Sequence, residues 1–462
     1  MPINSPHPLY EANAARWKRC RDCYEGEDAV KSAGQHYLPK IDPSQSEPEY
    51  QAYKKRAGYY EAVARTVDGF VGAISRKPHQ ITLPASIETL QAAATKDGAT
   101  LDDFIKRLCC ETLLMARGAI VVDMGDETQE PYLAFYPAEA ILNWGNDWVT
   151  LAETVYAPDA GDPYKLSEIQ QIRHLSLRDG RYTVGLWQKK TGSAVGDDWF
   201  LVAESTPAKR GTPLEKLPFF WLSTAGNSSA VAKPPLLGLA NTSLSHYRSA
   251  ADLEHGRHFT ALPTLYLSGV VNDEEPIAVG AGAVIKLADP TAKAGYAEFT
   301  GQGLQSLETA LATKEQQMAM LGASIIAGGP KGVEAAETAR IRTSGENSLL
   351  LGVVSTVEQA LTAALNFAAE WASTRPDGDV TVKLNRDFVD QHLDAQSLVG
   401  LLGAVQAGKL SLEDFLFALQ QAEMLRPDTN IEAEAKKLRA ADKSGVVPDP
   451  APTPKPPSVT AQ

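Results

Sequence analysis

Between residues 233 and 374 the hydrophobic pattern changes from helix to strand and back to helix, an order that few folds accommodate. Residues 233–258 and 302–325 have helical patterns, and residues 259–301 between them contain strand-like pieces and turn residues. If the two helices run antiparallel, they hold the small β unit at one end of a stalk, and the loop 326–337 lies at the other end. Such a stalk buries little of its own surface, so neighbouring copies of the chain must cover it. The order therefore predicts a ring with head-to-tail, heterologous contacts.

The N-terminal half divides into a helical part and a strand-like part. The first 80 residues are helical in pattern, and a further helix is predicted from Thr100, as its N-cap, to Gly118. Residues 118–222 contain short apolar or alternating runs rich in Val, Ile and aromatic residues, with "RDGR" as a hairpin signal. These runs predict an antiparallel β region, and the fold class is therefore α+β.

The C-terminal part is predicted to be mostly helical. Residues 338–374 form one long helix with a continuous buried seam, although Gly345 and Gly352 weaken it and could mark a bend. The seam residues, spaced by three and four, are Leu350, Val354, Val357, Leu361, Ala364, Ala368 and Trp371. A strand in "DVTVKLNRDF" follows, then two short helices joined at "AGKLS", with Ser411 capping the second. The proline-rich C-terminal segment contains too few apolar residues to form a core and is predicted to be disordered.

The charge balance restricts the kind of partner that the chain can hold. The 462 residues include 44 Lys and Arg against 57 Asp and Glu, a formal net charge of −13. An acidic chain is unsuited to gripping DNA over a broad surface, because neutralising phosphates requires clustered Lys and Arg. It is compatible with a surface past which DNA slides. The N-terminus lacks the apolar region of a signal peptide, and no uninterrupted apolar run approaches the roughly 18 residues of a membrane span, so neither export nor membrane insertion is expected.

No motif in the chain predicts a catalytic residue, a cofactor or a metal. "GAVQAGKLS" (403–411) lacks a Ser or Thr directly after its lysine and follows a helical pattern, so it is interpreted as a turn between helices. His255 and His258 lie three apart on a helix with no third ligand nearby, which favours a packing role. The cysteines, whose spacing does not suit a zinc site and predicts reduced thiols, are Cys20, Cys23 and the adjacent Cys109 and Cys110.

Several local motifs occur in series over most of the chain: "YYEAVARTVDGFVGAISRKP", "FYPAEAILNW", "LPFFWLS", "PPLLGLANTSLSHYRSAADLEHGRHFTALPTLYLSG", "GAVIKLAD", "EQQMAMLGASII", "ETARIRTSGENSLLLGVVSTVEQAL" and "AGKLSLEDFLFAL". None of them has the specificity of a metal-ligand set. Their serial order resembles that of the portal proteins of tailed bacteriophages, in a portal-like family of phages and prophages.

The resemblance implies a ring-forming portal fold with a wing, a helical stem, a small β-containing clip and a helical crown. On this chain the parts are the wing (1–232 with strand 375–386), the stem helices (233–258 and 302–325), the clip (259–301), the tunnel loop (326–337), the tunnel-lining helix (338–374), the crown (387–440) and the disordered tail (441–462).

The resemblance also assigns the glycine-rich loop to the narrowest point around the DNA. The residues expected to face the DNA are Gly328, Gly329, Pro330, Lys331 and Gly332. The glycines give the loop backbone freedom to adapt to a passing duplex whose symmetry differs from that of the ring. Lys331 attracts phosphates weakly, because salt screens the interaction, and the negative charges of Glu334 and Glu337 weaken this attraction further. A plain surface turn remains the alternative for this loop.

The function implied is that of a homododecamer at one capsid vertex, a conduit for packaging and ejection of double-stranded DNA. The implied partners are the terminase large subunit, the major capsid or scaffold protein and the head-completion adaptor, and the implied location is the virion, after assembly in the host cytoplasm. No ATP hydrolysis is expected of the chain, because a separate terminase supplies it.

Two other classes of protein remain open at this stage. One is a soluble hydrolase-like enzyme whose active site is non-local in sequence, and the other is a virion adaptor that only bridges other proteins. Light scattering separates the first from a portal, because a ring has many times the mass of the 49.7 kDa chain. Adaptors are usually shorter and lack paired stem helices, which argues against the second.

Overall fold

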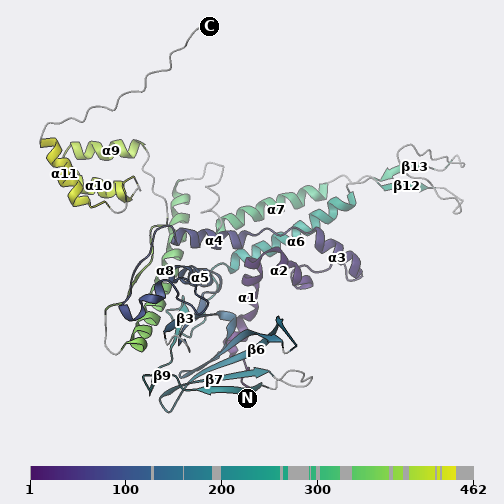
Figure 1. The fold of residues 1–462 in the computed structure, drawn as a ribbon. Helices are drawn as coiled ribbons and strands as arrows, with labels where there is room; N and C mark the ends of the chain where they lie inside the picture. Colours follow the sequence, from purple (N-terminus) through teal and green to yellow (C-terminus); the bar gives the residue numbers. More distant parts are fainter. Residues whose placement is uncertain are drawn as a thin grey trace, which may run out of the picture. The chain divides into compact units, whose positions relative to one another are not determined.

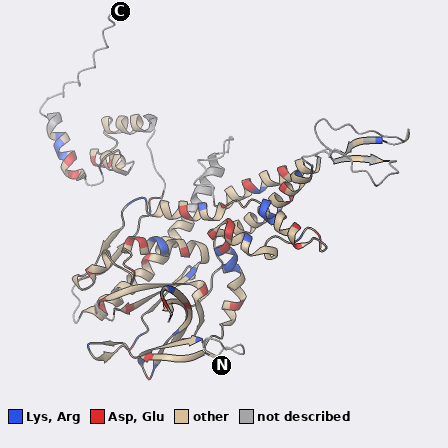
Figure 2. Ribbon diagram, turned by 45° about the vertical axis from the view of Figure 1, so that its right-hand side comes forward, with Lys and Arg blue, Asp and Glu red and all other residues tan. Residues whose placement is uncertain are grey.

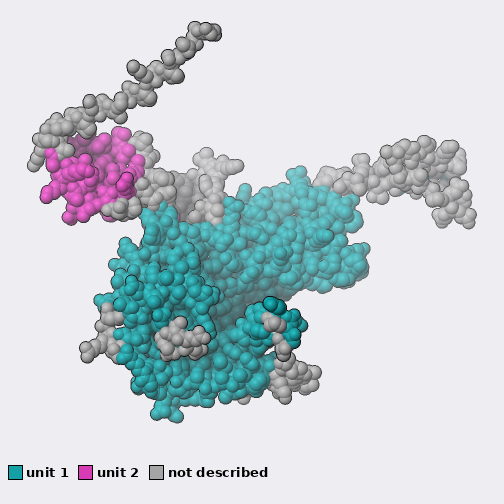
Figure 3. Space-filling model, in the orientation of Figure 1, with its two compact units in different colours: residues 1–386 teal, residues 387–462 magenta. Residues whose placement is uncertain are grey.

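The computed structural model contains two compact units, Met1–Arg386 and Asp387–Gln462 (Figure 3). The residues it describes are 2–125, 130–159, 161–189, 199–260, 264–268, 291, 293–297, 302–322, 336–373, 378–388, 395–421, 424–426 and 429–443. Over these residues the fold is a mixture of helices and sheets, and every strand pair is antiparallel.

Helices form most of the first 115 residues, as predicted (Figure 1). They are α1 (Pro8–Glu25), α2 (Glu27–Ser32), α3 (Glu47–Arg56), α4 (Ala62–Ile74) and α5 (Leu101–Met115), with short 3₁₀ turns η1 (Gly34–His36) and η2 (Ala85–Gln91). Pro8 occupies the first turn of α1, where a missing backbone donor does no harm, and the His7 side chain caps that turn. Thr100 caps α5 by accepting a hydrogen bond from the Asp103 N–H at 3.2 Å, which confirms the predicted cap. Trp17 on α1 is fully buried among these helices.

The predicted antiparallel β region is present as two sheets, with strand orders β11-β2-β3 and β4-β5-β6-β7-β8. Their strands are β2 (Arg117–Met124), β3 (Pro131–Pro137), β4 (Ile141–Trp144), β5 (Trp148–Asp159), β6 (Asp162–Arg178), β7 (Arg181–Lys189), β8 (Trp199–Ser205) and β11 (Phe219–Ser223); β9 (Ala208–Lys209) and β10 (Thr212–Pro213) form a small separate pair, and η3 (Ala138–Ala140) precedes β4. The hairpin signal "RDGR" is confirmed. Asp179 and Gly180 form the tight turn from β6 to β7, with positive φ values of 51° and 74°.

The predicted end of α5 at Gly118 is wrong by three residues. The helix ends at Met115, and Ala116 adopts the left-handed conformation, with φ of 57°, that closes the last turn. Gly118 instead lies within β2, where a Cβ would come 2.7 Å from the Phe135 ring on β3. The glycine is therefore required by the close approach of an aromatic ring from the neighbouring strand.

The long helix α8 (Ala336–Ala372) packs against α5 and the three-stranded sheet (Figure 1). All residues of the predicted seam are buried, and the helix continues through Gly345 and Gly352 without interruption. By length and composition the stretch Asn347–Ala372 is apolar enough to cross a membrane, but half of it is buried inside the protein. Its apolar residues serve as core for the sheet and α5.

The strand predicted in "DVTVKLNRDF" is only three residues long. β14 (Thr381–Lys383) pairs with β1 (Gln80–Thr82), so the end of the first unit returns to its N-terminal helices. The second unit contains the two predicted short helices, α9 (Ala395–Gln406) and α10 (Leu412–Gln421). The Ser411 hydroxyl caps α10 by accepting from the Asp414 N–H at 3.0 Å, so the near-match to a phosphate-binding loop is a turn between helices.

A third helix of the second unit, α11 (Ile431–Lys443), is missing from the predicted elements and continues past the predicted start of the tail at residue 441. Its sequence consists largely of alanine and charged residues, which give a weak apolar period. Residues 444–462 of the predicted tail lie outside the described residues.

Stability is expected to fall as the pH is lowered through 6.5. Burial lowers the pKa of five histidines: His7, His79, His174, His246 and His255. The folded state therefore favours the neutral rings, whereas in the unfolded chain each ring binds a proton near its ordinary pKa of 6.5, so acid shifts the equilibrium toward unfolding. Urea unfolding followed by tryptophan fluorescence should show a lower midpoint at about pH 5.5 than at about pH 7.5. An equal or higher midpoint at the lower pH would contradict the prediction.

Candidate functional site

Two antiparallel helices, α6 (Leu237–Thr260) and α7 (Gln302–Leu321), form the part of the first unit that the sequence predicts to be a stalk (Figure 1). The Lys314 ammonium donates to the Ser245 carbonyl oxygen at 3.0 Å and to the Ser249 hydroxyl at 2.6 Å. Further along, a Cβ on Gly256 would come 2.7 Å from Leu304. The residue numbers of the contacts increase along α6 while they decrease along α7, so the two helices run antiparallel.

The two helices of the pair differ in how much of their surface the chain covers. α6 packs on α1, α3 and α4 in addition to α7. α7 packs mainly on α6, and of its apolar side chains only Met318 is fully buried in the part of the chain described. The face of α7 turned away from α6 is exposed and carries no charge; its residues are Gln305, Thr309, Gln316 and Met320.

A two-stranded ladder lies between α6 and α7 in the sequence. β12 (Thr264–Ser268) pairs with β13 (Lys293–Ala297), and Tyr266 on β12 is half exposed and lies over Gly295. The strand predicted at "TLYLSGVV" is present in its first half. The strand predicted at "GAGAVIKLA" lies outside the described residues, and β13 itself was missed because "KAGYA" contains few β-branched or aromatic residues.

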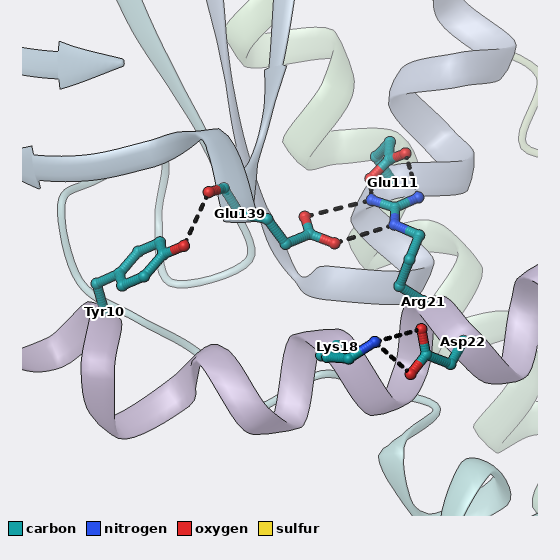
Figure 4. Close-up of polar contacts among 6 residues, drawn as sticks. All are labelled: Tyr10, Lys18, Arg21, Asp22, Glu111 and Glu139. Atoms are coloured by element: carbon teal, nitrogen blue, oxygen red, sulfur yellow. Dashed lines mark hydrogen bonds and ion pairs between the residues drawn. The ribbon is translucent and has the colours of Figure 1, made fainter. Parts of the chain in front are cut away.

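An ion-pair cluster fixes α1, one of the helices that support α6 (Figure 4). The Arg21 guanidinium donates to both carboxylate oxygens of Glu111 on α5, at 2.8 and 2.7 Å, and to Glu139 on η3 at 2.9 Å. The Tyr10 hydroxyl donates to the Glu139 carbonyl oxygen at 3.0 Å. Because bidentate guanidinium–carboxylate pairs fix direction as well as distance, this cluster sets the orientation of α1, and Arg19 of α1 then bonds Asn241 of α6 at 2.7 Å.

The five residues predicted to face DNA, Gly328, Gly329, Pro330, Lys331 and Gly332, lie outside the described residues, so their role stays a prediction. The described chain ends on one side of them at Gly322 and resumes in α8 at Ala336. At Gly322 a Cβ would come 2.8 Å from Thr66 of α4, so this glycine permits close packing of the end of α7 on α4. Sequence reasoning placed Gly322 inside the predicted helix 302–325, whereas α7 ends at Leu321. A glycine near the end of a helical pattern was a usable signal for this earlier end.

The histidines and cysteines considered for metal or thiol chemistry lie in packed surroundings. His255 packs edge-on against Tyr53 with ring centres 5.3 Å apart, which confirms its packing role, and His258 contacts Phe259. The residues described contain no group of three or more His, Cys, Asp or Glu side chains placed to hold a metal ion. The four cysteines are free thiols, and burial raises their pKa values to about 12 for Cys20 and Cys109 and about 11 for Cys23 and Cys110. At neutral pH they remain protonated.

A family model described as "Domain of unknown function (DUF4055)" matches residues 235–372, from the start of α6 to the end of α8. Among curated proteins, none is similar to this chain at the level of sequence.

Solved structures similar to the chain come from gene transfer agent (GTA) particles. One is described as the virion of a native GTA particle, at 13% identity and a TM-score of 0.42, covering 84% of this chain and 98% of that one. Another is the neck of an empty GTA particle computed with C6 symmetry, at 13% identity and a TM-score of 0.42, covering 80% and 92%. A third is the neck of a native GTA particle computed with C12 symmetry, at 14% identity and a TM-score of 0.39, covering 85% and 98%. Because these TM-scores lie below 0.5, the likeness by itself does not establish a shared function.

Proposed function

We propose that this chain is the subunit of a portal-like ring at one vertex of a phage-like capsid, a conduit through which double-stranded DNA is packaged and ejected. The ring contains twelve copies and docks the terminase during packaging and a head-completion adaptor afterwards. The chain itself hydrolyses nothing. It functions in the virion, held there by the major capsid or scaffold protein.

The uncovered face of α7 is the observation that carries the proposal. Within the described residues, this 20-residue helix packs mainly on one partner and buries a single apolar side chain, so that part of the chain supports it poorly. Met320 on it is 74% exposed, and Leu321 is 47% exposed. Isolated helix pairs of this kind gain stability by tertiary packing, and identical neighbours arranged head to tail supply it at every position of a ring.

The proposed path of DNA uses the segment that connects α7 to α8. The motif order that resembles portal proteins assigns Gly328–Gly332 to the loop closest to the duplex, with Lys331 as a weak phosphate contact. An acidic protein with few fixed cationic contacts allows DNA to move along its axis, since each neutralised phosphate adds salt-dependent affinity.

Size-exclusion chromatography with light scattering tests the proposed ring. The purified chain should elute as a particle of about 600 kDa, twelve times the 49.7 kDa of one copy, with a central hole in negative-stain images. A monomer or dimer at micromolar concentration would rule the proposal out and favour the enzyme alternative.

Deleting Gly328–Gly332 should leave ring assembly intact and strongly reduce the DNA retained in particles. The deletion removes the backbone freedom and the one lysine of the proposed DNA-facing loop without touching a described helix. Nuclease-protected DNA per particle is the measurement, and Lys331→Ala is the milder companion variant. Normal packaging by the deletion would remove the loop from the mechanism.

A further inference from the structure

An open groove of about 330 Å³ lies between α6 and α7 and is lined by carboxylates. Acidic positions occur along this helix pair (Figure 2). Glu254 comes from α6, and Glu308 and Glu315 come from α7. Arg257 bonds two of them, with nitrogen–oxygen distances of 2.8 Å to Glu254 and 2.8 Å to Glu308. Three carboxylates against one guanidinium leave the groove with excess negative charge, and Glu315 is the carboxylate that Arg257 does not neutralise.

His246 lines the same groove and lies beside Glu315. Its side chain is 9% exposed, its Nε2 lies 3.4 Å from Glu315, and its Nδ1 has no hydrogen-bond partner among the described residues. Burial lowers the pKa of this ring, so it is neutral near pH 7. With the proton on Nε2, facing Glu315, the buried Nδ1 is an acceptor. The Glu315 carboxylate, whose side chain is 55% exposed, is therefore the acceptor that the groove offers beside a neutral ring, which suits a Lys or Arg side chain.

α3 packs on α6 on the side away from α7 (Figure 1). A basic cluster lies at the C-terminal end of α3. It consists of Lys54, Lys55 and Arg56, of which Lys55 is exposed. α3 is fixed to α6 by a bond from the Tyr53 hydroxyl to Asp252 at 2.6 Å. Asp252 lies six residues after His246, which places the two on different sides of a helix with 3.6 residues per turn.

We propose that the groove between α6 and α7 of one subunit receives the basic end of α3 from the next copy of the chain, with Lys55 facing Glu315. The inference rests on the proposed ring and names the contact that closes it. Each subunit carries the acceptor groove on one side of α6 and the cationic end on the other, so the contact is heterologous and propagates around a ring. Charge complementarity of this kind fixes register and steers assembly.

Two charge reversals test the contact, first alone and then mixed. Glu315→Lys places lysine opposite Lys55 at every interface, and Lys55→Glu places glutamate opposite Glu315. Each variant should raise the concentration at which half of the chains are in rings by about tenfold or more, because like charges face each other. In an equimolar mixture the two variants can alternate, so that every interface again pairs opposite charges, and rings containing both chains should return. Glu88→Lys on η2, an exposed reversal away from both surfaces, should assemble as the original chain does.

The outcomes separate this inference from the proposed function. If the original chain forms rings and both reversals assemble equally well, or if the mixture of two impaired variants stays unassembled, the contact is overturned while the ring stands. If the original chain is monomeric, the proposed function itself fails. Assembly that requires added Ca²⁺ or Mg²⁺ and is lost in EDTA would also overturn the contact, because the groove would then hold an ion. Unchanged circular dichroism spectra for both variants show that folding is not the cause.

Discussion

Thr309→Arg combined with Gln316→Arg on α7 is expected to reduce the particle from about 600 kDa to the 49.7 kDa of a single chain, while the circular dichroism spectrum shows that the subunit remains folded. Both side chains are exposed on the α7 face turned away from α6, so the isolated subunit tolerates arginine there. In the proposed ring the next subunit covers this face. Two large cations would then be buried at each interface without partners, and an uncompensated buried charge costs about 3–5 kcal/mol.

The control for this variant places the same side chains on another exposed surface. Thr89→Arg with Gln91→Arg, both exposed on η2, adds the same charge and should leave the ring intact. Light scattering of both variants at one salt concentration is the measurement. A ring that survives the α7 substitutions would show that this face borders open space, such as the lumen, and that other surfaces hold the subunits together.

Much of the secondary structure could be predicted because its signals are local. The α8 seam from Leu350 to Trp371 follows the helical period closely, and the whole set is buried as expected. The turn at Asp179 and Gly180 needs two residues with positive φ, and "RDGR" supplies them within four letters. The helix caps Thr100 and Ser411 could also be predicted, because a hydroxyl before a helical run accepts a hydrogen bond from a backbone N–H only three residues away.

What sequence reasoning missed depends on residues that meet only in three dimensions. Gly118, Gly256 and Gly322 each allow a side chain from another element to approach the backbone. The residues near each glycine in the sequence do not indicate which side chain approaches it. The groove on α6 and α7 has the same origin, since His246 and Glu315 are 69 residues apart. The available sequence signal for this groove was the presence of opposite charges on the two segments, 233–258 and 302–325, that were expected to run antiparallel. The proposed DNA-facing loop stays a prediction from motif order.

A buried arginine that packs over two adjoining tryptophan rings is the most pronounced contact that only the fold reveals. Arg117 on β2 is fully buried, with its guanidinium carbon 4.3 Å from the Trp144 ring centre and 4.1 Å from that of Trp221. The guanidinium also donates to the backbone carbonyl oxygens of Ser229 and Ala230, at 2.9 and 3.1 Å. The contact therefore ties β2 to β4, to β11 and to the segment that leads into α6.

Arg117→Ala is expected to lower the free energy of unfolding by about 4 kcal/mol, because a desolvated cation–π contact contributes about 2 kcal/mol or more and two are lost along with packing. Burial opposes the charge: it lowers the pKa of Arg117 to about 10, and two of its nitrogens, Nε and Nη2, have no partner among the described residues. Arg117→Met separates these effects, since methionine keeps most of the volume between the rings but removes the cation. If the cation–π contacts outweigh the cost of burying the charge, urea unfolding should place Arg117→Met about 2 kcal/mol below the original chain, with Arg117→Ala below both. A methionine variant as stable as the original would mean that the two tryptophans need only a filled space between them, and that the positive charge contributes nothing to the junction of these strands.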